Sequence, residues 1–138
     1  MWCLDRHFPL LRLLGPPWNK IGWVFVAAGV LVDAVSVATF IRAKTTVNPL
    51  RVDRASRLVV SGLYRVTRNP MYLGLVTLLA GWALLLGSFS PWLMLMAFER
   101  LMVTLQIRPE EYALAARFPT EYAQYTRRVN RWFGRVNR

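Results

Sequence analysis

The sequence has one cysteine and one histidine, Cys3 and His7, and both lie within its first seven residues. A single cysteine allows no internal disulfide and no cysteine-based metal cluster. A zinc site takes three or four ligands that are mostly of these two types, so we expect no metal centre. The chain also lacks a glycine-rich phosphate loop and a Ser-His-Asp set, which removes the commonest phosphate-binding and hydrolytic sites.

Acidic residues are also few, with seven Asp and Glu against 18 Lys and Arg, a formal net charge of +11. We expect no nucleic-acid partner, because no recognised nucleic-acid-binding motif accompanies this charge. The basic residues gather on two segments. Residues 42–68 carry seven against one acid, and residues 108–138 carry seven against three. Anionic lipid headgroups are the expected partners of such segments.

Long apolar runs set the fold class, because 55% of the residues are hydrophobic and the mean hydropathy is +0.30. Residues 21–41 hold one charged residue, Asp33, and residues 71–98 hold none. A spanning helix needs about 20 apolar residues, so the second run is a hairpin that turns at residues 87–91. We therefore predict a single-domain, all-α integral membrane protein over residues 1–138. It has about three transmembrane helices at 21–41, 70–86 and 91–107, and cytosolic or interfacial helices at 109–118 and 120–133.

The charge distribution predicts which side of the membrane each segment occupies. The hairpin turn has no charged residue, whereas the segments that flank the hairpin are strongly basic. This is the positive-inside pattern for basic segments in the cytosol. We expect the inner membrane of a bacterium, with the active site on the cytosolic face.

The tail after the last predicted span has its own pattern. Apolar and aromatic residues recur at helical spacing and lie opposite arginines, which predicts an interfacial helix with its arginines towards lipid phosphate and its aromatic rings towards lipid. The stripe consists of Phe118, Tyr122, Tyr125, Val129 and Trp132, and the opposite face of Arg127, Arg128, Arg131 and Arg135.

Two polar clusters stand at the ends of the predicted hairpin, one at residues 65–74 and the other at 107–111. Each has a structural explanation by itself. Asn69-Pro70 suits a helix start, and Glu110 and Glu111 complement a helix dipole. Because the ends of a hairpin share one membrane face, the clusters together predict one site.

These clusters resemble known sequences. Residues 45–49, 61–65 and Arg68-Asn69-Pro70-Met71-Tyr72-Leu73-Gly74, followed by Glu110-Glu111 and Glu121-Tyr122, resemble the isoprenylcysteine carboxyl methyltransferase family. The related phosphatidylethanolamine N-methyltransferases share much of this pattern. The resemblance covers roughly residues 42–133.

The resemblance implies an integral membrane methyltransferase that uses S-adenosylmethionine. It assigns the cofactor pocket to Arg68, Asn69, Pro70, Tyr72, Glu110 and Glu111. The chain departs from the family at Asn69, where the eukaryotic enzymes have His, and at Pro119, where Gly is expected. Its N-terminal part also has fewer spans than the eukaryotic relatives. A second subunit of a homo-oligomer could supply the missing lipid-facing wall.

The expected acceptor is lipophilic, and an isoprenylcysteine-type carboxylate is favoured. A carboxylate is already ionised and needs only a positioning cation, for which Arg131 is the candidate. Tyr125 is the second candidate catalytic residue, since tyrosine faces attract a sulfonium. A phospholipid amine would need a base, and a thiol acceptor stays open. The alternative outside enzymes is a lipid-binding membrane scaffold.

Overall fold

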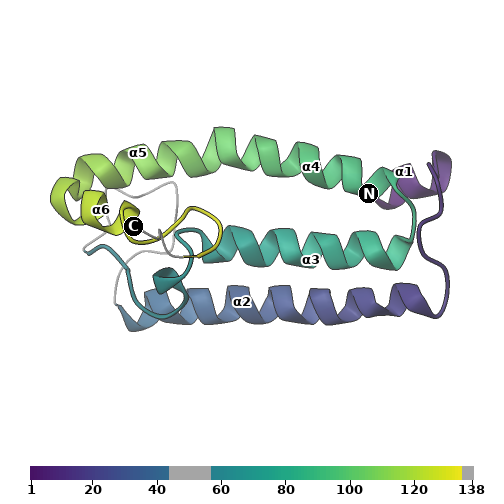
Figure 1. Ribbon diagram of the computed structural model, residues 1–138, viewed down its shortest axis with the longest axis horizontal. Helices are drawn as coiled ribbons and strands as arrows, with labels where there is room; N and C mark the ends of the chain where they lie inside the picture. The colour runs from purple at the N-terminus through teal and green to yellow at the C-terminus, as the bar shows by residue number, and fades with distance from the viewer. Residues whose placement is uncertain (44–56, 135–138) are drawn as a thin grey trace.

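The computed structural model describes residues 1–43 and 57–134, and within these ranges every regular element is helical. Figure 1 shows α2, α3 and the α4–α5 rod lying lengthwise beside one another, with α6 at one end and α1 at the other. The elements are α1 (Trp2–His7), the short helix η1 (Trp18–Ile21), α2 (Gly22–Arg42), η3 (Gly62–Arg65), α3 (Pro70–Leu86), α4 (Ser90–Met102), the π-helical turn η4 (Val103–Ile107), α5 (Arg108–Arg117) and α6 (Pro119–Thr126).

Helices α2 and α3 pack closely because each presents two glycines seven residues apart. Gly22 lies against Gly81, and Gly29 lies against Gly74. A Cβ atom on Gly29 would lie 2.6 Å from the Gly74 carbonyl oxygen and 2.7 Å from the Leu78 backbone nitrogen. Small residues of this kind let two helix backbones approach within contact distance, as they do between helices in membranes.

The predicted hairpin is confirmed, and its turn lies where the sequence placed it. Helix α3 begins at Pro70 and ends at Leu86, and Gly87 follows in the left-handed conformation with φ 81°. Glycine adopts this conformation without steric cost, which is why it ends so many helices. Pro91 lies in the first turn of α4, a position that needs no backbone N–H donor.

The predicted helix break before Pro109 is wrong. Helix α4 runs through the π turn η4 directly into α5, so that residues 90–117 form one continuous rod (Figure 1). A proline inside a helix has no N–H to donate and its ring crowds the preceding turn. The wider π turn immediately before α5 accommodates Pro109 without ending the helix.

Among residues 1–43 and 57–134, one helical stretch is long and apolar enough to cross a membrane by length and composition, Trp18–Arg42, which joins η1 to α2. Only 11% of its most apolar window is buried, unlike a core helix of a soluble protein. Its outer face exposes large apolar side chains, including Trp23, Val30 and Leu31. Helix α3 is apolar but has 17 residues, so spans at 70–86 and 91–107 stay predictions.

The N-terminal segment folds over the hairpin turn at the end far from α6 (Figure 1). The Ser90 hydroxyl donates to the Phe8 carbonyl at 2.6 Å, and the Leu13 N–H donates to the Gly87 carbonyl at 2.8 Å. The Ser88 hydroxyl also donates to the Asp5 carboxylate. Residues 1–14 therefore cap this end of the bundle.

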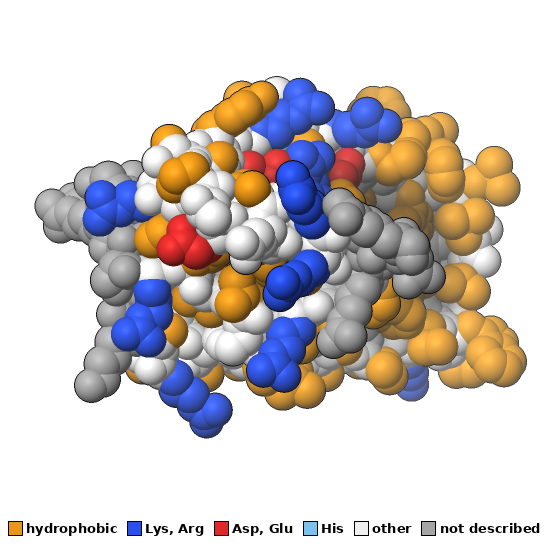
Figure 2. Space-filling model, turned by 60° about the vertical axis from the view of Figure 1, so that its left-hand side comes forward, with side chains coloured by type: hydrophobic (Ala, Val, Ile, Leu, Met, Phe, Trp, Pro, Cys, Tyr) orange, Lys and Arg blue, Asp and Glu red, His pale blue; other side chains and the backbone are white. Residues whose placement is uncertain are grey.

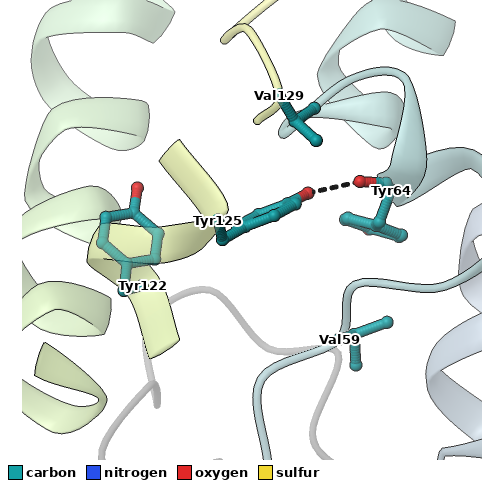
Figure 3. Close-up of a cluster of buried hydrophobic side chains, with 5 residues drawn as sticks. All are labelled: Val59, Tyr64, Tyr122, Tyr125 and Val129. Atoms are coloured by element: carbon teal, nitrogen blue, oxygen red, sulfur yellow. Dashed lines mark hydrogen bonds between the residues drawn. The ribbon is translucent and has the colours of Figure 1, made fainter. Parts of the chain in front are cut away.

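The tail departs from the predicted helix over 120–133, because α6 ends at Thr126. Beyond it the chain turns back, and the Arg68 N–H donates to the Asn130 carbonyl while the Gly134 N–H donates to the Val66 carbonyl. Four residues of the predicted stripe, Phe118, Tyr122, Tyr125 and Val129, pack against protein. Figure 3 shows its residues Tyr122, Tyr125 and Val129 gathered with Val59 and Tyr64 in a buried cluster.

Candidate functional site

The two polar clusters predicted from the sequence meet at the α6 end of the molecule. The first leads into α3, where Asn69 and Pro70 are buried at the helix start. The second opens α5, where Glu110 and Glu111 lie in the first turn. The hairpin brings its two ends together, as expected, and the tail adds a third wall.

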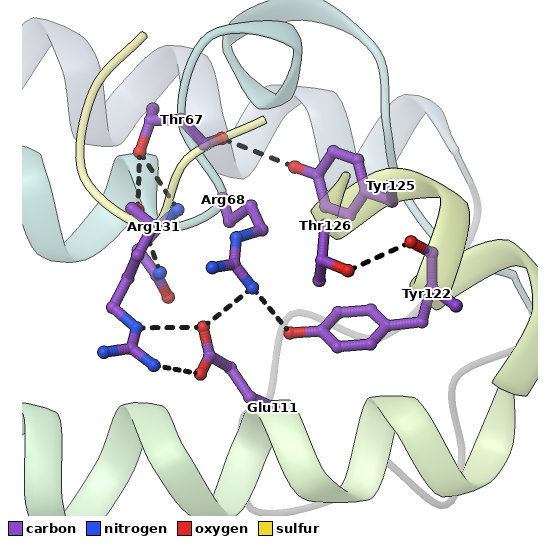
Figure 4. Close-up of polar contacts among 9 residues, drawn as sticks. Thr67, Arg68, Glu111, Tyr122, Tyr125, Thr126 and Arg131 are labelled. Atoms are coloured by element: carbon purple, nitrogen blue, oxygen red, sulfur yellow. Dashed lines mark hydrogen bonds and ion pairs between the residues drawn. The ribbon is translucent and has the colours of Figure 1, made fainter. Parts of the chain in front are cut away.

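Glu111 holds two arginines at once (Figure 4). Its Oε1 lies 3.1 Å from Nη1 of Arg68, and its Oε2 lies 2.6 Å from Nη2 of Arg131. Arg131 also donates from Nε to Oε1 at 3.1 Å, so its guanidinium grips the carboxylate with two parallel bonds. These hydrogen bonds raise the pKa of Arg131 further, and it stays charged. Below, this group is called the Arg–Glu–Arg cluster.

The backbone carbonyl of Arg131 accepts two hydrogen bonds from side chains. The Thr67 hydroxyl donates to it at 3.2 Å, and the Asn69 side-chain amide donates to it at 3.1 Å. Asn69 therefore ties the tail to the start of α3. This contact uses a side chain at the position where eukaryotic relatives have histidine, and it gives Asn69 a structural task independent of any imidazole.

A second polar pair lies one residue along α5. The Tyr72 hydroxyl donates to Oε2 of Glu110 at 2.9 Å. Burial raises the pKa of Glu110, the Tyr72 hydrogen bond lowers it, and the charge of Glu111 raises it again, for a net rise. The two adjacent glutamates thus have different environments.

Tyr125 and Arg131, the two candidate catalytic residues, have different surroundings. Arg131 belongs to the Arg–Glu–Arg cluster, whereas Tyr125 is buried and its hydroxyl donates to the Tyr64 carbonyl at 2.7 Å (Figure 3). Burial raises the pKa of Tyr125 well above the ordinary tyrosine value, so the hydroxyl stays a donor. Its position indicates a role in holding the tail rather than in the chemistry.

Tyr122 is a member of the site that the sequence pattern did not indicate. The Tyr122 hydroxyl accepts a 3.4 Å hydrogen bond from Nη1 of Arg68, and burial raises the pKa of Tyr122 above the ordinary tyrosine value. The helical spacing of Tyr122 and Tyr125 predicts a lipid-facing stripe, whereas both side chains are buried against protein.

Comparison with known proteins identifies the family. The phospholipid methyltransferase family matches residues 18–121, three quarters of the chain. A protein of Haemophilus influenzae, described as uncharacterized, is 39% identical over 62 residues, which cover 45% of this chain and 98% of that protein. No solved structure matches. The isoprenylcysteine branch stays a prediction. Because the match over residues 18–121 covers most of the sequence, the chain belongs to the phospholipid methyltransferase family.

Proposed function

We propose that this protein transfers a methyl group from S-adenosylmethionine to a lipophilic acceptor at the membrane surface. The observation that carries the proposal is the contact between Tyr72 and Glu110, residues 38 apart in sequence, directly beside the Arg–Glu–Arg cluster. A half-buried carboxylate, a phenol ring and two guanidinium groups meet where an apolar hairpin ends. A water-soluble donor and a membrane-bound acceptor can both reach such a place.

The side chains present fit the cofactor. When bound, S-adenosylmethionine supplies an electrophilic methyl group on a sulfonium. The Glu110 carboxylate accepts hydrogen bonds from hydroxyl or ammonium groups, and the Tyr72 ring attracts a cation. Methyl transfer is an in-line displacement that depends on position, which buried and mutually bonded side chains supply. We assign cofactor contact first to Tyr72 and Glu110. Asn69 and Pro70 build the adjoining wall.

Two acceptor classes are supported by different observations. An isoprenylcysteine-type carboxylate, favoured by the motifs, would use Arg131 as its positioning cation. A phospholipid amine is protonated and must lose its proton to a base before it attacks. Glu110 is our candidate base, since it lies beside Tyr72 at this site and burial raises its pKa. The family match adds weight to the phospholipid. No feature of the described residues specifically supports a thiol acceptor.

Isothermal titration of the detergent-solubilised protein with S-adenosylhomocysteine tests the proposal. We expect saturable binding at one site. Glu110→Gln should weaken it roughly tenfold to a hundredfold, since a hydrogen bond to a charged group contributes about 1.5–3 kcal/mol. Glu121→Gln, an exposed carboxylate in the first turn of α6, is the matched control and should bind normally. Absence of binding by a sample whose circular dichroism shows folded helices would favour the scaffold instead.

A further inference from the structure

We infer that one side of α4 binds a second copy of this chain, through two reciprocal ion pairs between Glu99 of one copy and Arg100 of the other. The inference goes beyond the proposed function and does not depend on it. It rests on the predicted span over residues 91–107, on the exposure of these two side chains and on their positions around the helix.

Arg100 lies midway along the predicted span. Glu99 and Arg100 are the only charged residues between Met71 and Ile107. Ser90 begins α4 ten residues before Arg100, and Glu110 of the candidate site follows ten residues after it, so each lies about 15 Å away along the rod. Because the hydrocarbon core of a bilayer is about 30 Å thick, a rod that spans it over these residues carries Arg100 near its middle.

This depth is unusual for a basic residue of this chain. Figure 2 shows Lys and Arg side chains gathered at the α6 end of the molecule, with mainly hydrophobic side chains beyond them. Arg100 lies outside that gathering, on a helix whose exposed side chains include Met96 and Leu101, which are 54% and 57% exposed. Its surroundings on α4 are therefore apolar.

One copy of the chain neutralises Arg100 poorly. The Arg100 side chain is 89% exposed, and Oε2 of Glu99 lies 3.8 Å from its Nε, which is too long for a hydrogen bond. Ionisable side chains within a membrane span almost always face protein or a water-filled cavity, and they pair with one another. An arginine turned outward at this depth therefore indicates that another protein surface covers it.

A second copy supplies the complementary charges at the same depth. Neighbouring residues lie about 100° apart around a helix, so Glu99 and Arg100 flank a line marked by Met96 one turn before them and Val103 one turn after. When two parallel copies of α4 meet along this line about a twofold axis, the acidic flank of each lies beside the basic flank of the other. Both ion pairs then form at once. Figure 1 shows α4 at the edge of the bundle, where such an approach is open.

The test measures association in phosphatidylcholine vesicles, by energy transfer between copies labelled at the native Cys3, which is exposed. Wild-type transfer should exceed random proximity and persist as the protein is diluted in lipid. Arg100→Gln and Glu99→Gln should each weaken association about tenfold or more, because each variant removes both pairs between the copies. Arg117→Gln removes an exposed arginine from the same rod beyond the predicted span and should associate like the wild type.

Charge reversal distinguishes pairing between copies from pairing within one copy. Arg100→Glu leaves two neighbouring acids and Glu99→Arg leaves two neighbouring bases, so neither variant should associate with itself. An equimolar mixture of the two should associate, because every contact between copies then joins an acid to a base. A contact that acts only within one chain cannot be rescued by mixing.

Cross-linking needs no change of charge, so it decides the matter even if the reversed variants fail to insert. In a Cys3→Ser background, Met96→Cys should form a disulfide between copies under mild oxidation. Leu101→Cys is as exposed but lies about 140° further around α4, and it should not. Wild-type transfer that disappears on dilution, equal cross-linking at the two positions, or folded reversal variants that do not associate when mixed would overturn the inference. S-adenosylhomocysteine binding reports on the proposed function independently.

Discussion

The Tyr72 hydroxyl donates a 2.9 Å hydrogen bond to Oε2 of Glu110, which joins the first turn of α3 to the first turn of α5. The neighbouring Glu111 faces Arg68 and Arg131 instead. Two adjacent carboxylates thus have opposite surroundings, one held among cations and one buried beside a phenol. Such a division is typical of sites in which two acids do different work.

Glu110 should make stability depend on pH. Its folded-state pKa is raised, mainly by burial, so the stability it contributes is fully present below the ordinary glutamate pKa and is lost as pH rises through the folded value. We expect the wild-type melting temperature to fall across this window. Glu110→Gln should flatten that part of the profile, as measured by circular dichroism in detergent between pH 4 and pH 8. Glu121→Gln is the exposed control, and an equal flattening there would refute the assignment.

Gly29 should tolerate no side chain. A Cβ atom would meet backbone atoms of Gly74 and Leu78, which cannot rotate away. Gly29→Ala should lower the free energy of unfolding by about 1–3 kcal/mol, the usual cost of overpacking a core. Ala28→Val, on the exposed side of α2, should be close to neutral. Equal melting temperatures for the two variants would show that α2 and α3 are not in contact.

Tyr125→Phe should affect folding rather than cofactor binding. The variant leaves the Tyr64 carbonyl without its 2.7 Å donor, at a cost of about 1–3 kcal/mol for a buried group left unpaired. S-adenosylhomocysteine affinity should not change. Tyr112→Phe removes a hydroxyl from a side chain that is 76% exposed and should change neither quantity. If Tyr125→Phe had a normal melting temperature but no methyl-transfer activity, Tyr125 would have a catalytic role instead.

The two ends of the bundle should lie on opposite sides of the membrane. Cys3 is exposed at the N-terminal end, and Gln124 is exposed on α6 beside the site. On intact cells, a membrane-impermeant thiol reagent should label native Cys3, whereas Gln124→Cys in a Cys3→Ser background should label only after lysis. Labelling of Gln124→Cys alone would invert the topology and place the site away from cytosolic S-adenosylmethionine.

Sequence and structure agree where local chemistry decides the outcome. Pro70 and Gly87 bound α3 because proline suits a helix start and glycine suits the left-handed residue at its end. The meeting of Arg68 with Glu111 was also within reach, since the ends of a hairpin must share one face.

The predictions that fail concern segments whose local structure depends on contacts between residues far apart in the sequence. Pro109 ordinarily signals a helix start, and only the π turn keeps the rod continuous. The tail sequence has the pattern of an amphipathic helix. The chain forms a turn there instead, because the turn buries Tyr125 and Val129 together and lets the Arg68 N–H bond the Asn130 carbonyl. Arg131 reaches Glu111 only because of that turn, so this ion pair could not be predicted from spacing.

The central claim is that this site transfers methyl groups to a lipid, and the direct test is transfer itself. The purified protein is reconstituted with a total membrane lipid extract and supplied with S-adenosylmethionine that carries a radiolabelled methyl group. The account predicts that label enters the organic phase with wild-type protein and with Glu121→Gln. Glu110→Gln should reduce the rate at least tenfold while the protein stays folded. Label confined to the aqueous phase with folded wild-type protein, or equal rates for the two glutamate variants, would contradict it.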